Sequence, residues 1–403
     1  MYAKFRHAHA THPDWAVAVE ECLLHLQGQS AAAGYVRAPN LGFLYLTDQL
    51  AAHAQAILTM LKGRTGISSW VGASGAGICA TGAECVDEPA LAVMLGQFTP
   101  GTFNVFSGNQ RPPAIGTRTH EDQLAAWTAL VHADPQTPDL PALLEDMSYK
   151  LASASLWGGV ASGRNHRIHI ADQILSGGLS GVVFSERIGW QTALAQGCFP
   201  LPQASAHTIT ASAAQKILTL DGQRAFDVLL KDAGLGPPHS STAIDTALRD
   251  ALHTLARQGL FVGLAPRLGP ALGAPDWGYL IRHLYALEPE SGAVVTTADD
   301  LTGQRMIFCT RDEAAARAEL TSRCAQLLEA CGGRQAIQGV IYISCLGRGS
   351  HLFGETGQEL ALIQSELGPV PLVGFYASGE ISGRDLYQYS GVLIAFSASS
   401  KNA

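Results

Sequence analysis

The chain has 403 residues, of which 47% are apolar and only 15% are charged, and its formal net charge is −8. This composition excludes a disordered chain and a coiled coil, and an acidic chain without a basic block is a poor candidate for binding nucleic acid. The length predicts roughly two to three domains, and the 43 glycines predict many turns and close backbone approaches.

The N-terminal segment and the cysteines indicate a cytoplasmic protein. Residues 1–15 contain Lys4, Arg6 and three histidines, but the apolar stretch of a signal peptide does not follow them. No apolar run reaches the about 20 residues that a membrane-spanning helix needs. The eight cysteines are scattered and lack the spacing of zinc ligands. We therefore expect buried free thiols, a cytoplasmic location and no membrane contact.

Residues 41–77 predict a strand, a helix and a second strand in succession. The apolar run 41–47 (LGFLYLT) is typical of a buried strand. Asp48 is the predicted N-cap of a helix that ends at Gly63. The run 67–77 (ISSWVGASGAG) then predicts a strand that leads into a glycine turn.

The same order recurs in the C-terminal part of the chain. The apolar run 339–345 predicts a buried strand. Thr356 and Glu359 have the spacing of a capping box at the start of a helix, and Gly368 is its predicted end. The run 371–379 predicts a strand that leads into a second glycine turn.

These two segments predict an internal duplication. Helices predicted to begin at Asp14 and Asp312 precede the two first strands at equal distances, and the glycine turns 72–77 and 374–379 align. The sequence thus predicts an α/β fold of two pseudo-repeated halves, each a mixed sheet flanked by helices, with the turns paired across a pseudo-twofold axis. Ligands of such sheets bind beyond the carboxyl ends of the strands, where both turns lie. An extended run is expected after each turn, at residues 103–107 and 392–396.

The middle of the chain has a different residue pattern. Strands are predicted at 179–185 and 207–210. The segment 196–200 predicts a turn of restricted geometry, because its proline limits the preceding residue to extended conformations. The segment 234–241 is expected to be a loop.

A boundary between the two halves is predicted near residue 220. Asp221 and Gly222 predict a tight turn, which leads into a helix around residues 226–230. The predicted domains are therefore residues 1–220 and residues 221–403.

The chain resembles the FIST family of bacterial sensory proteins, which combine an N-terminal and a C-terminal FIST domain. The resemblance implies that residues 1–220 are FIST N-like and residues 221–403 FIST C-like, in a non-enzymatic sensor of small ligands that acts in signal transduction. Since no output domain accompanies them, the signal is expected to pass to a separate partner such as a histidine kinase. Some FIST-like proteins bind haem and respond to nitric oxide, so a haem-based sensor is an alternative. Four segments carry the resemblance: WVGASGAG (70–77), QGCFPL (196–201) running on to Asp221-Gly222, SCLGRG (344–349) and PLVGFYASGEI (371–381).

The two glycine turns are the first candidate ligand site. Glycines let the backbone approach a ligand and leave N–H groups free as donors. The second turn adds an aromatic face, a hydroxyl and a carboxylate, and a carboxylate suits the amine of an amino-acid-like metabolite. The alternative is that the turns only permit tight packing between the halves. The candidate residues here are Ser74, Gly75, Gly77, Tyr376, Ser378, Gly379 and Glu380.

Cys345 and Arg348 follow a predicted strand at its carboxyl end. Arg348 is suited to hold a ligand carboxylate or to activate Cys345 as a nucleophile. Gln196 and Cys198 are further candidates for ligand contact. Buried structural thiols are the alternative for both cysteines. A cysteine-dependent enzyme acting on a small metabolite is therefore a rival function, whereas the fragment GASGA at 72–76 lacks the last glycine of the hydrolase motif.

Histidines are plentiful, with 14 in the chain. A haem needs one axial histidine and an apolar cavity, so the sequence pattern barely constrains it. His166, His169 and His351 are the candidate axial ligands, because each lies near a segment that carries the resemblance. No metal site is predicted. The cofactor is left open, with haem as a candidate, and a homo-oligomer is one expectation for the assembly.

Overall fold

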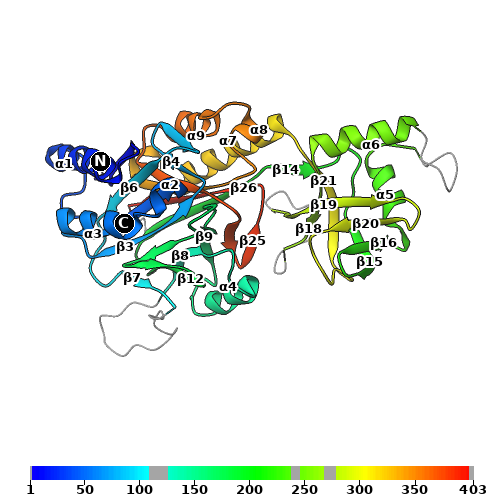
Figure 1. Ribbon diagram of the computed structural model, residues 1–403, viewed down its shortest axis with the longest axis horizontal. Helices are drawn as coiled ribbons and strands as arrows, with labels where there is room; N and C mark the ends of the chain where they lie inside the picture. Colours follow the sequence, from blue (N-terminus) through cyan, green and yellow to red (C-terminus); the bar gives the residue numbers. More distant parts are fainter. Residues whose placement is uncertain (1, 109–125, 237–245, 267–277, 399–403) are drawn as a thin grey trace. The chain divides into compact units, whose positions relative to one another are not determined.

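The computed structural model describes residues 2–108, 126–236, 246–266 and 278–398 (Figure 1). The chain forms two compact units. Unit 1 comprises Met1–Ala195, Arg317–Leu386 and Ser390–Ala403, and unit 2 comprises Gln196–Ala316 and Tyr387–Tyr389. Both contain helices and sheets, which confirms the predicted α/β class. The boundary predicted near residue 220 separates two continuous halves of the sequence, which differ from these two units, and it stays a prediction.

Unit 1 contains three six-stranded sheets with the same internal order. In each sheet, two parallel strands are joined by a helical connection. An antiparallel strand lies beside the first of them, and an antiparallel hairpin strand lies beside the second. The strand–helix–strand unit predicted twice from the sequence is therefore present three times.

The strands of the three sheets are as follows. The first sheet, in the order β1-β6-β2-β3-β10-β11, consists of β1 (Arg6–Thr11), β2 (Leu41–Thr47), β3 (Ser69–Gly75), β6 (Ala90–Gly96), β10 (His169–Ala171) and β11 (Ile174–Leu175). The second, in the order β7-β12-β8-β9-β24-β25, consists of β7 (Phe103–Phe106), β8 (Thr128–Ala133), β9 (Leu156–Val160), β12 (Leu179–Phe184), β24 (Glu380–Gly383) and β25 (Asp385–Tyr387). The third, in the order β13-β26-β22-β23-β4-β5, consists of β4 (Gly77–Ala80), β5 (Ala83–Val86), β13 (Gly189–Gln196), β22 (Ile337–Cys345), β23 (Leu372–Ala377) and β26 (Ser390–Ser397).

The hairpin that follows each second parallel strand joins a different sheet. β4 and β5 follow β3 but pair with β23 of the third sheet. β10 and β11 follow β9 but pair with β3 of the first sheet. β24 and β25 follow β23 but pair with β9 of the second sheet. Each sheet gives a hairpin to one neighbour and receives one from the other, so segments far apart in sequence close a ring.

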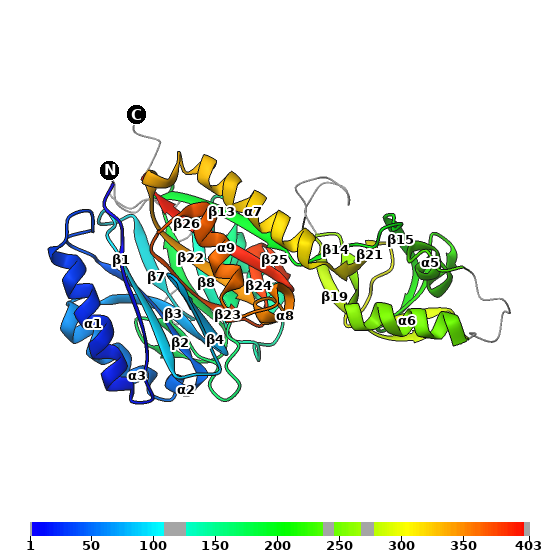
Figure 2. The same cartoon turned by 90° about the horizontal axis from the view of Figure 1, so that it is seen from above.

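The helices of unit 1 cover the outer faces of the sheets, and the inner faces share one core (Figures 1 and 2). The shared core takes apolar side chains from β2, β8 and β22 together, and it is rich in phenylalanine. Outer clusters join the first sheet to α1 and α3 and the second sheet to α4. The helices are α1 (Trp15–Ala31), α2 (Asp48–Ala51), α3 (Ala54–Thr65), α4 (Leu140–Ser148), α7 (Glu313–Ala330), α8 (Ser350–Phe353) and α9 (Gln358–Leu367), with a 3-10 turn at Arg334–Ala336.

Several predicted helix ends are confirmed and others are wrong. Asp14 caps α1 by accepting a hydrogen bond from the backbone of Ala16 at 2.8 Å, and Gly368 follows α9. The end predicted at Gly63 is wrong, because α3 continues to Thr65 and is followed by Gly66, which takes the left-handed conformation at φ +72°. Asp48 is the first residue of α2 and not a side-chain cap, since its carboxylate binds the backbone of Asn165 instead.

Two strand predictions also need correction. The segment 196–200 is not a turn, because β13 runs to Gln196 and β14 (Cys198–Pro200) pairs antiparallel with β21 (Arg305–Arg311). The extended run at 103–107 is present as β7, but it does not correspond to β26. The counterpart of β26 in the sheet order is β6, and β7 occupies the place of β1.

Unit 2 is an antiparallel barrel. Its ring of β21, β15, β16, β20, β19 and β18 closes because β18 also pairs with β21, and closure removes free strand edges. Asp221 and Gly222 form the predicted turn, with positive φ at both positions. Of the loop predicted at 234–241, residues 237–241 lie outside the described residues. The further bounds are β15 (His207–Ala213), β16 (Lys216–Leu220), β17 (Gln223–Arg224), α5 (Ala225–Asp232), α6 (Thr246–Gln258), β18 (Leu260–Leu264), β19 (Leu280–Glu288), β20 (Ala293–Thr296) and β21 (Arg305–Arg311).

The structure also shows the state of the cysteines and the length and polarity of the helices. All eight cysteines are free and buried, as expected. Within the described ranges, every helix is too short or too polar to span a lipid bilayer.

Candidate functional site

Three equivalent glycines let the parallel strands of unit 1 approach each other closely. At each of them, an added Cβ would lie less than 2 Å from a carbonyl oxygen of the neighbouring parallel strand. Any side chain there would force the two strands apart, so glycine is required by the approach and not by a positive φ. The pairs are Gly72 with Leu44 at 1.7 Å, Gly158 with Val131 at 1.8 Å and Gly374 with Tyr342 at 1.6 Å.

The three glycine turns that follow these positions converge. Ser162, in the second turn, donates its backbone N–H to the carbonyl of Ser74 at 3.2 Å. Its hydroxyl accepts from the backbone of Ala76 at 3.0 Å and donates to the carbonyl of Tyr376. Ser378, in the third turn, donates its backbone N–H to the carbonyl of Val160 at 3.1 Å. The predicted pairing of two turns is thus a meeting of three, at the carboxyl ends of β3, β9 and β23.

A buried ion pair lies beside the third turn. The carboxylate of Glu359 accepts hydrogen bonds from Arg348 Nε and the Tyr342 hydroxyl, both at 2.6 Å, from the Ser344 hydroxyl at 2.9 Å and from the backbone of Gly349 at 3.2 Å. Arg348 and Glu359 are fully enclosed. Burial by itself lowers the pKa of Arg348, but the charge of Glu359 more than offsets this and raises the pKa above its ordinary value.

The capping box predicted for α9 is wrong for this reason. Glu359 turns inward to Arg348, and Gly357 occupies the cap position without a side-chain hydrogen bond. The start of α9 is capped by Glu84 of the exchanged hairpin, whose carboxylate accepts from the backbone of Gly357 at 2.8 Å and of Leu360 at 3.3 Å. Glu84, which is distant in sequence, therefore caps α9 in place of Glu359. Burial raises the pKa of Glu84.

Glu380 is a second buried carboxyl group near Arg348. Its Oε2 accepts from the Ser390 hydroxyl at 2.8 Å and from the Ser390 backbone at 3.1 Å. Burial raises the pKa of Glu380 to about 8, against the opposing effects of Ser390, of the Arg348 charge and of a hydrogen bond with Cys345. Glu380 is therefore mostly protonated at neutral pH.

Two buried polar atoms in this region, Arg348 Nη2 and Glu380 Oε1, have no hydrogen-bond partner among the described residues. The buried Tyr376 hydroxyl also lacks a close partner there, and it faces the Glu84 carboxylate, whose pKa it lowers. The Tyr376 hydroxyl lies next to Gly349, only 2.9 Å from the place of an added Cβ, and Arg348 acts on Glu380 through its charge. An unpaired buried polar group costs about 1–3 kcal/mol. Such atoms are commonly completed by water or by a ligand. We call Arg348, Tyr376 and Glu380 the polar niche.

The pKa of Glu380 predicts a pH-dependent stability. Between the ordinary value of 4.5 and about 8, the folded protein holds a proton that the unfolded chain releases, so stability falls as pH rises through this range and levels off above it. Glu380→Gln keeps the neutral form and removes this contribution. Urea unfolding from pH 5 to pH 9 should show that Glu380→Gln gains stability relative to the natural chain as pH rises. An unchanged difference between the two proteins across this range would contradict the assignment.

The remaining candidate residues of the first and third turns form hydrogen bonds and packing contacts where the three turns meet. Ser74 is buried, and its hydroxyl donates to the carbonyl of His166 at 2.6 Å and accepts from the backbone of Ile168 at 3.0 Å. Gly75 and Gly77 press against Tyr376, with an added Cβ only 2.9 and 3.0 Å from its atoms. Ser378 donates its hydroxyl to the carbonyl of Ala161 at 3.1 Å, and the carbonyl of Gly379 accepts from the backbone of Val160 at 2.9 Å.

The cysteine and glutamine candidates divide between the two units. Cys345 lies in unit 1 beside Glu380 and is 6% exposed. Cys198 is fully buried in unit 2, in an apolar cluster with Cys309. Gln196 belongs to the same unit and accepts a hydrogen bond from the backbone of Tyr279 at 3.2 Å. Burial of both thiols favours their structural role, since reactive cysteines are accessible.

The three candidate histidines lie in different surroundings. His169 is buried, burial lowers its pKa, and both ring nitrogens are engaged, with the Ser180 hydroxyl at 2.5 Å and the carbonyl of Gly177 at 3.0 Å. His166 and His351 are exposed. His166 lines a cavity of about 360 Å³ whose other walls include Asp48, Asp87, Arg164 and Asn165, and such polar walls do not suit a porphyrin.

Haem binding and a response to nitric oxide stay predictions. An absorption spectrum of protein purified from haem-supplemented cells tests them through the Soret band. No group of three or more metal-ligating side chains is found within the described part of the chain.

Sequence reasoning missed the second glycine turn and the inward role of Glu359. The second turn carries the triplet Ala161-Ser162-Gly163, which repeats Ala377-Ser378-Gly379 of the third turn. That identity was a usable signal. The partners of Glu359 lie on β22 and the loop after it, and no sequence pattern distinguishes this inward position from a capping box.

Comparison with known proteins agrees with the resemblance seen in the sequence. The FIST N domain model matches residues 40–223 and the FIST C domain model matches residues 241–383. An uncharacterized protein of Mycobacterium tuberculosis strain H37Rv is 28% identical over 378 residues, which cover 92% of this chain and 93% of that protein. An uncharacterized protein of Mycobacterium bovis is also 28% identical over 378 residues, covering 92% of each chain.

Proposed function

The chain belongs to the FIST family, whose domains are generally sensory domains of signal transduction that bind small ligands, and we propose that it senses an amino-acid-like metabolite at the polar niche. The observation that carries the proposal is the set of buried polar atoms on Arg348, Tyr376 and Glu380 that lack a close hydrogen-bond partner among the described residues. They offer a cationic donor, a hydroxyl and a carboxyl oxygen within one region. FIST domains are sensory rather than catalytic, so binding and not turnover is the expected activity.

The chemistry of the niche suits a zwitterion. The planar guanidinium of Arg348 matches a carboxylate. Its Nη2 is the donor left after Nε has bound Glu359 and Nη1 has bound the carbonyl of Ala195. The Tyr376 hydroxyl is a second donor to the same carboxylate. The Glu380 carboxyl, once ionised, pairs with the ligand ammonium. Both ends of an α-amino acid are thereby recognised.

Entry of the ligand requires movement at the loop after β22. Arg348 lies in this short loop between β22 and α8, and the neighbouring Leu346 is 39% exposed. Gly349 in the same loop has φ +51° and ψ −136°, a conformation suited to glycine. A displacement of this loop on binding changes the surface around Leu346, which is a route for the signal to a separate protein. A histidine kinase as that partner, a homo-oligomer and a cytoplasmic location stay predictions.

A thermal-shift survey of the twenty amino acids tests the proposal. At 100 times its dissociation constant, a true ligand stabilises the protein by about 2.7 kcal/mol. Tyr376→Phe should keep the fold, because it keeps the buried ring and removes only the hydroxyl, and it should reduce the shift. If every amino acid leaves the unfolding temperature unchanged, the proposal is wrong.

A further inference from the structure

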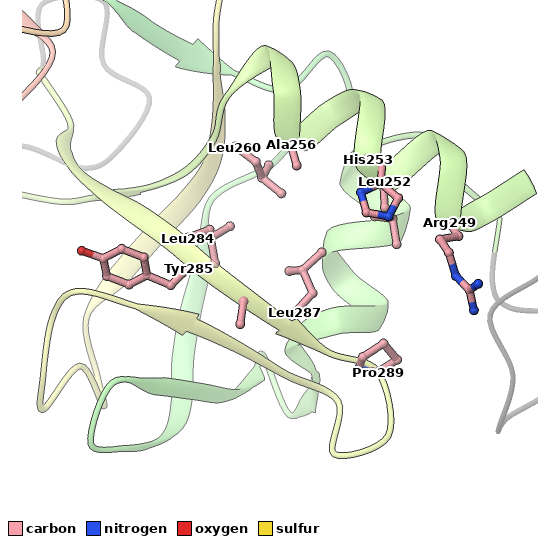
Figure 3. Close-up of a pocket in the computed structure, with 10 residues that line it drawn as sticks. Arg249, Leu252, His253, Ala256, Leu260, Leu284, Tyr285, Leu287 and Pro289 are labelled. Atoms are coloured by element: carbon pink, nitrogen blue, oxygen red, sulfur yellow. The ribbon is translucent and has the colours of Figure 1, made fainter. Parts of the chain in front are cut away.

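Unit 2 contains a cavity of about 320 Å³ between α6 and β19 (Figure 3). Leu252 and Ala256 of α6 line one wall, and Leu260, Leu284 and Leu287 line the others. The cavity lies in a unit apart from the polar niche, and its apolar walls call for a different ligand chemistry. Cavities of this size take small molecules.

A β-bulge shapes the floor of this cavity. The register of β19 with β20 shifts between Leu284, which pairs with Thr296, and Ala286, which pairs with Val295. In a regular strand, residues three positions apart face opposite sides. The extra residue, Tyr285, is 69% exposed. With this shift, the consecutive residues Leu284 to Leu287 all contribute to the cavity lining. Bulges often re-aim side chains beside functional sites.

One edge of the cavity carries basic side chains. Arg249 and His253 are four positions apart on α6, so they share one side of the helix, and both line the cavity (Figure 3). Glu288 is the acid next to Leu287 on β19. Its carboxylate accepts hydrogen bonds from Lys216 at 2.6 Å and from the Ser291 hydroxyl at 2.8 Å. Glu288 therefore forms its ion pair with Lys216 rather than with Arg249.

We propose that this cavity binds an aliphatic carboxylate of medium chain length. The chain lies against the leucines of α6, β18 and β19, and the carboxylate accepts hydrogen bonds from Arg249 and His253 at the edge. Since a cavity of 150 Å³ holds benzene, this one holds roughly a dozen heavy atoms. Decanoate matches that size, whereas a long-chain fatty acid exceeds it.

Calorimetric titration of the full chain with decanoate tests this proposal, with decanol as the uncharged analogue of the same length. Decanoate should bind at least tenfold more tightly than decanol. Arg249→Gln should weaken decanoate at least tenfold and leave decanol unchanged. Arg257→Gln is the matched control, because Arg257 is an exposed arginine on the same helix that does not line the cavity.

A second variant tests the apolar part. Leu284→Trp fills the cavity from its floor and should abolish binding of both compounds, with circular dichroism to check the fold. Equal affinities of decanoate and decanol, or an unchanged decanoate affinity in Arg249→Gln, would overturn the proposal. Absence of decanoate binding to the natural chain would overturn it as well.

Discussion

Replacing Gly374 by alanine is expected to destabilise unit 1 by more than about 4 kcal/mol, which is exceptional for a single methyl group. The added Cβ would lie 1.6 Å from the carbonyl oxygen of Tyr342, so β22 and β23 would have to separate at the centre of the third sheet. Gly158→Ala should have an effect of the same size, because its Cβ meets Val131 in the same way at 1.8 Å. Urea unfolding, followed by circular dichroism, measures both changes.

Gly63→Ala is the matched control for these glycine variants. Gly63 lies within α3, is exposed and has no atom near the place of an added Cβ. Alanine is the better helix former by roughly 1 kcal/mol, so this variant should be more stable than the natural chain. If Gly374→Ala proved as stable as Gly63→Ala, the close strand approach that defines the three repeats would be wrong.

Glu359→Ala should destabilise the protein by about 3–5 kcal/mol. The substitution leaves the Arg348 guanidinium enclosed without its counter-ion, and an uncompensated buried charge is the costly result of breaking such a pair. It also removes the acceptor of Tyr342 and Ser344. Equilibrium unfolding in urea at pH 7 is the measurement.

Two companion variants separate the buried charge from general damage. Asp146→Ala breaks the solvent-exposed pair of Asp146 with Lys150, and surface pairs contribute at most about 1 kcal/mol. The double variant Arg348→Met with Glu359→Leu should recover part of the lost stability, since paired apolar replacements remove the unpaired charge. A loss below 1 kcal/mol for Glu359→Ala would show that Arg348 finds another partner.

The local elements of the fold could be predicted from sequence because the residues that determine each element are contiguous in the chain. The apolar runs at 41–47 and 339–345 became β2 and β22, and Asp14 caps α1. The two strand–helix–strand units were visible for the same reason. The third unit, β8–α4–β9, was not predicted, although the triplet Ala161-Ser162-Gly163 that follows it repeats a triplet of the third turn.

The exchange of hairpins between sheets could not be predicted in this way. Glu84 caps α9 from a position 273 residues earlier in the chain, and this long-range contact leaves Glu359 to face Arg348. Pairing of β4 with β23 likewise joins segments that no local pattern relates. Sequence reasoning therefore identified Arg348, Tyr376 and Glu380 as candidates, but not the buried acid that holds Arg348 in place.

Calorimetric titration in two buffers of different ionisation enthalpy tests the proposed ligand recognition most directly. The ligand is the amino acid that gives the largest thermal shift, and the proteins are the natural chain and Glu380→Gln at pH 7. Because burial raises the pKa of Glu380 to about 8, an ammonium bound there should displace nearly one proton from the natural chain. Glu380→Gln should bind more weakly and release none. Equal affinity of the two proteins without proton release would contradict recognition of the ligand at Glu380.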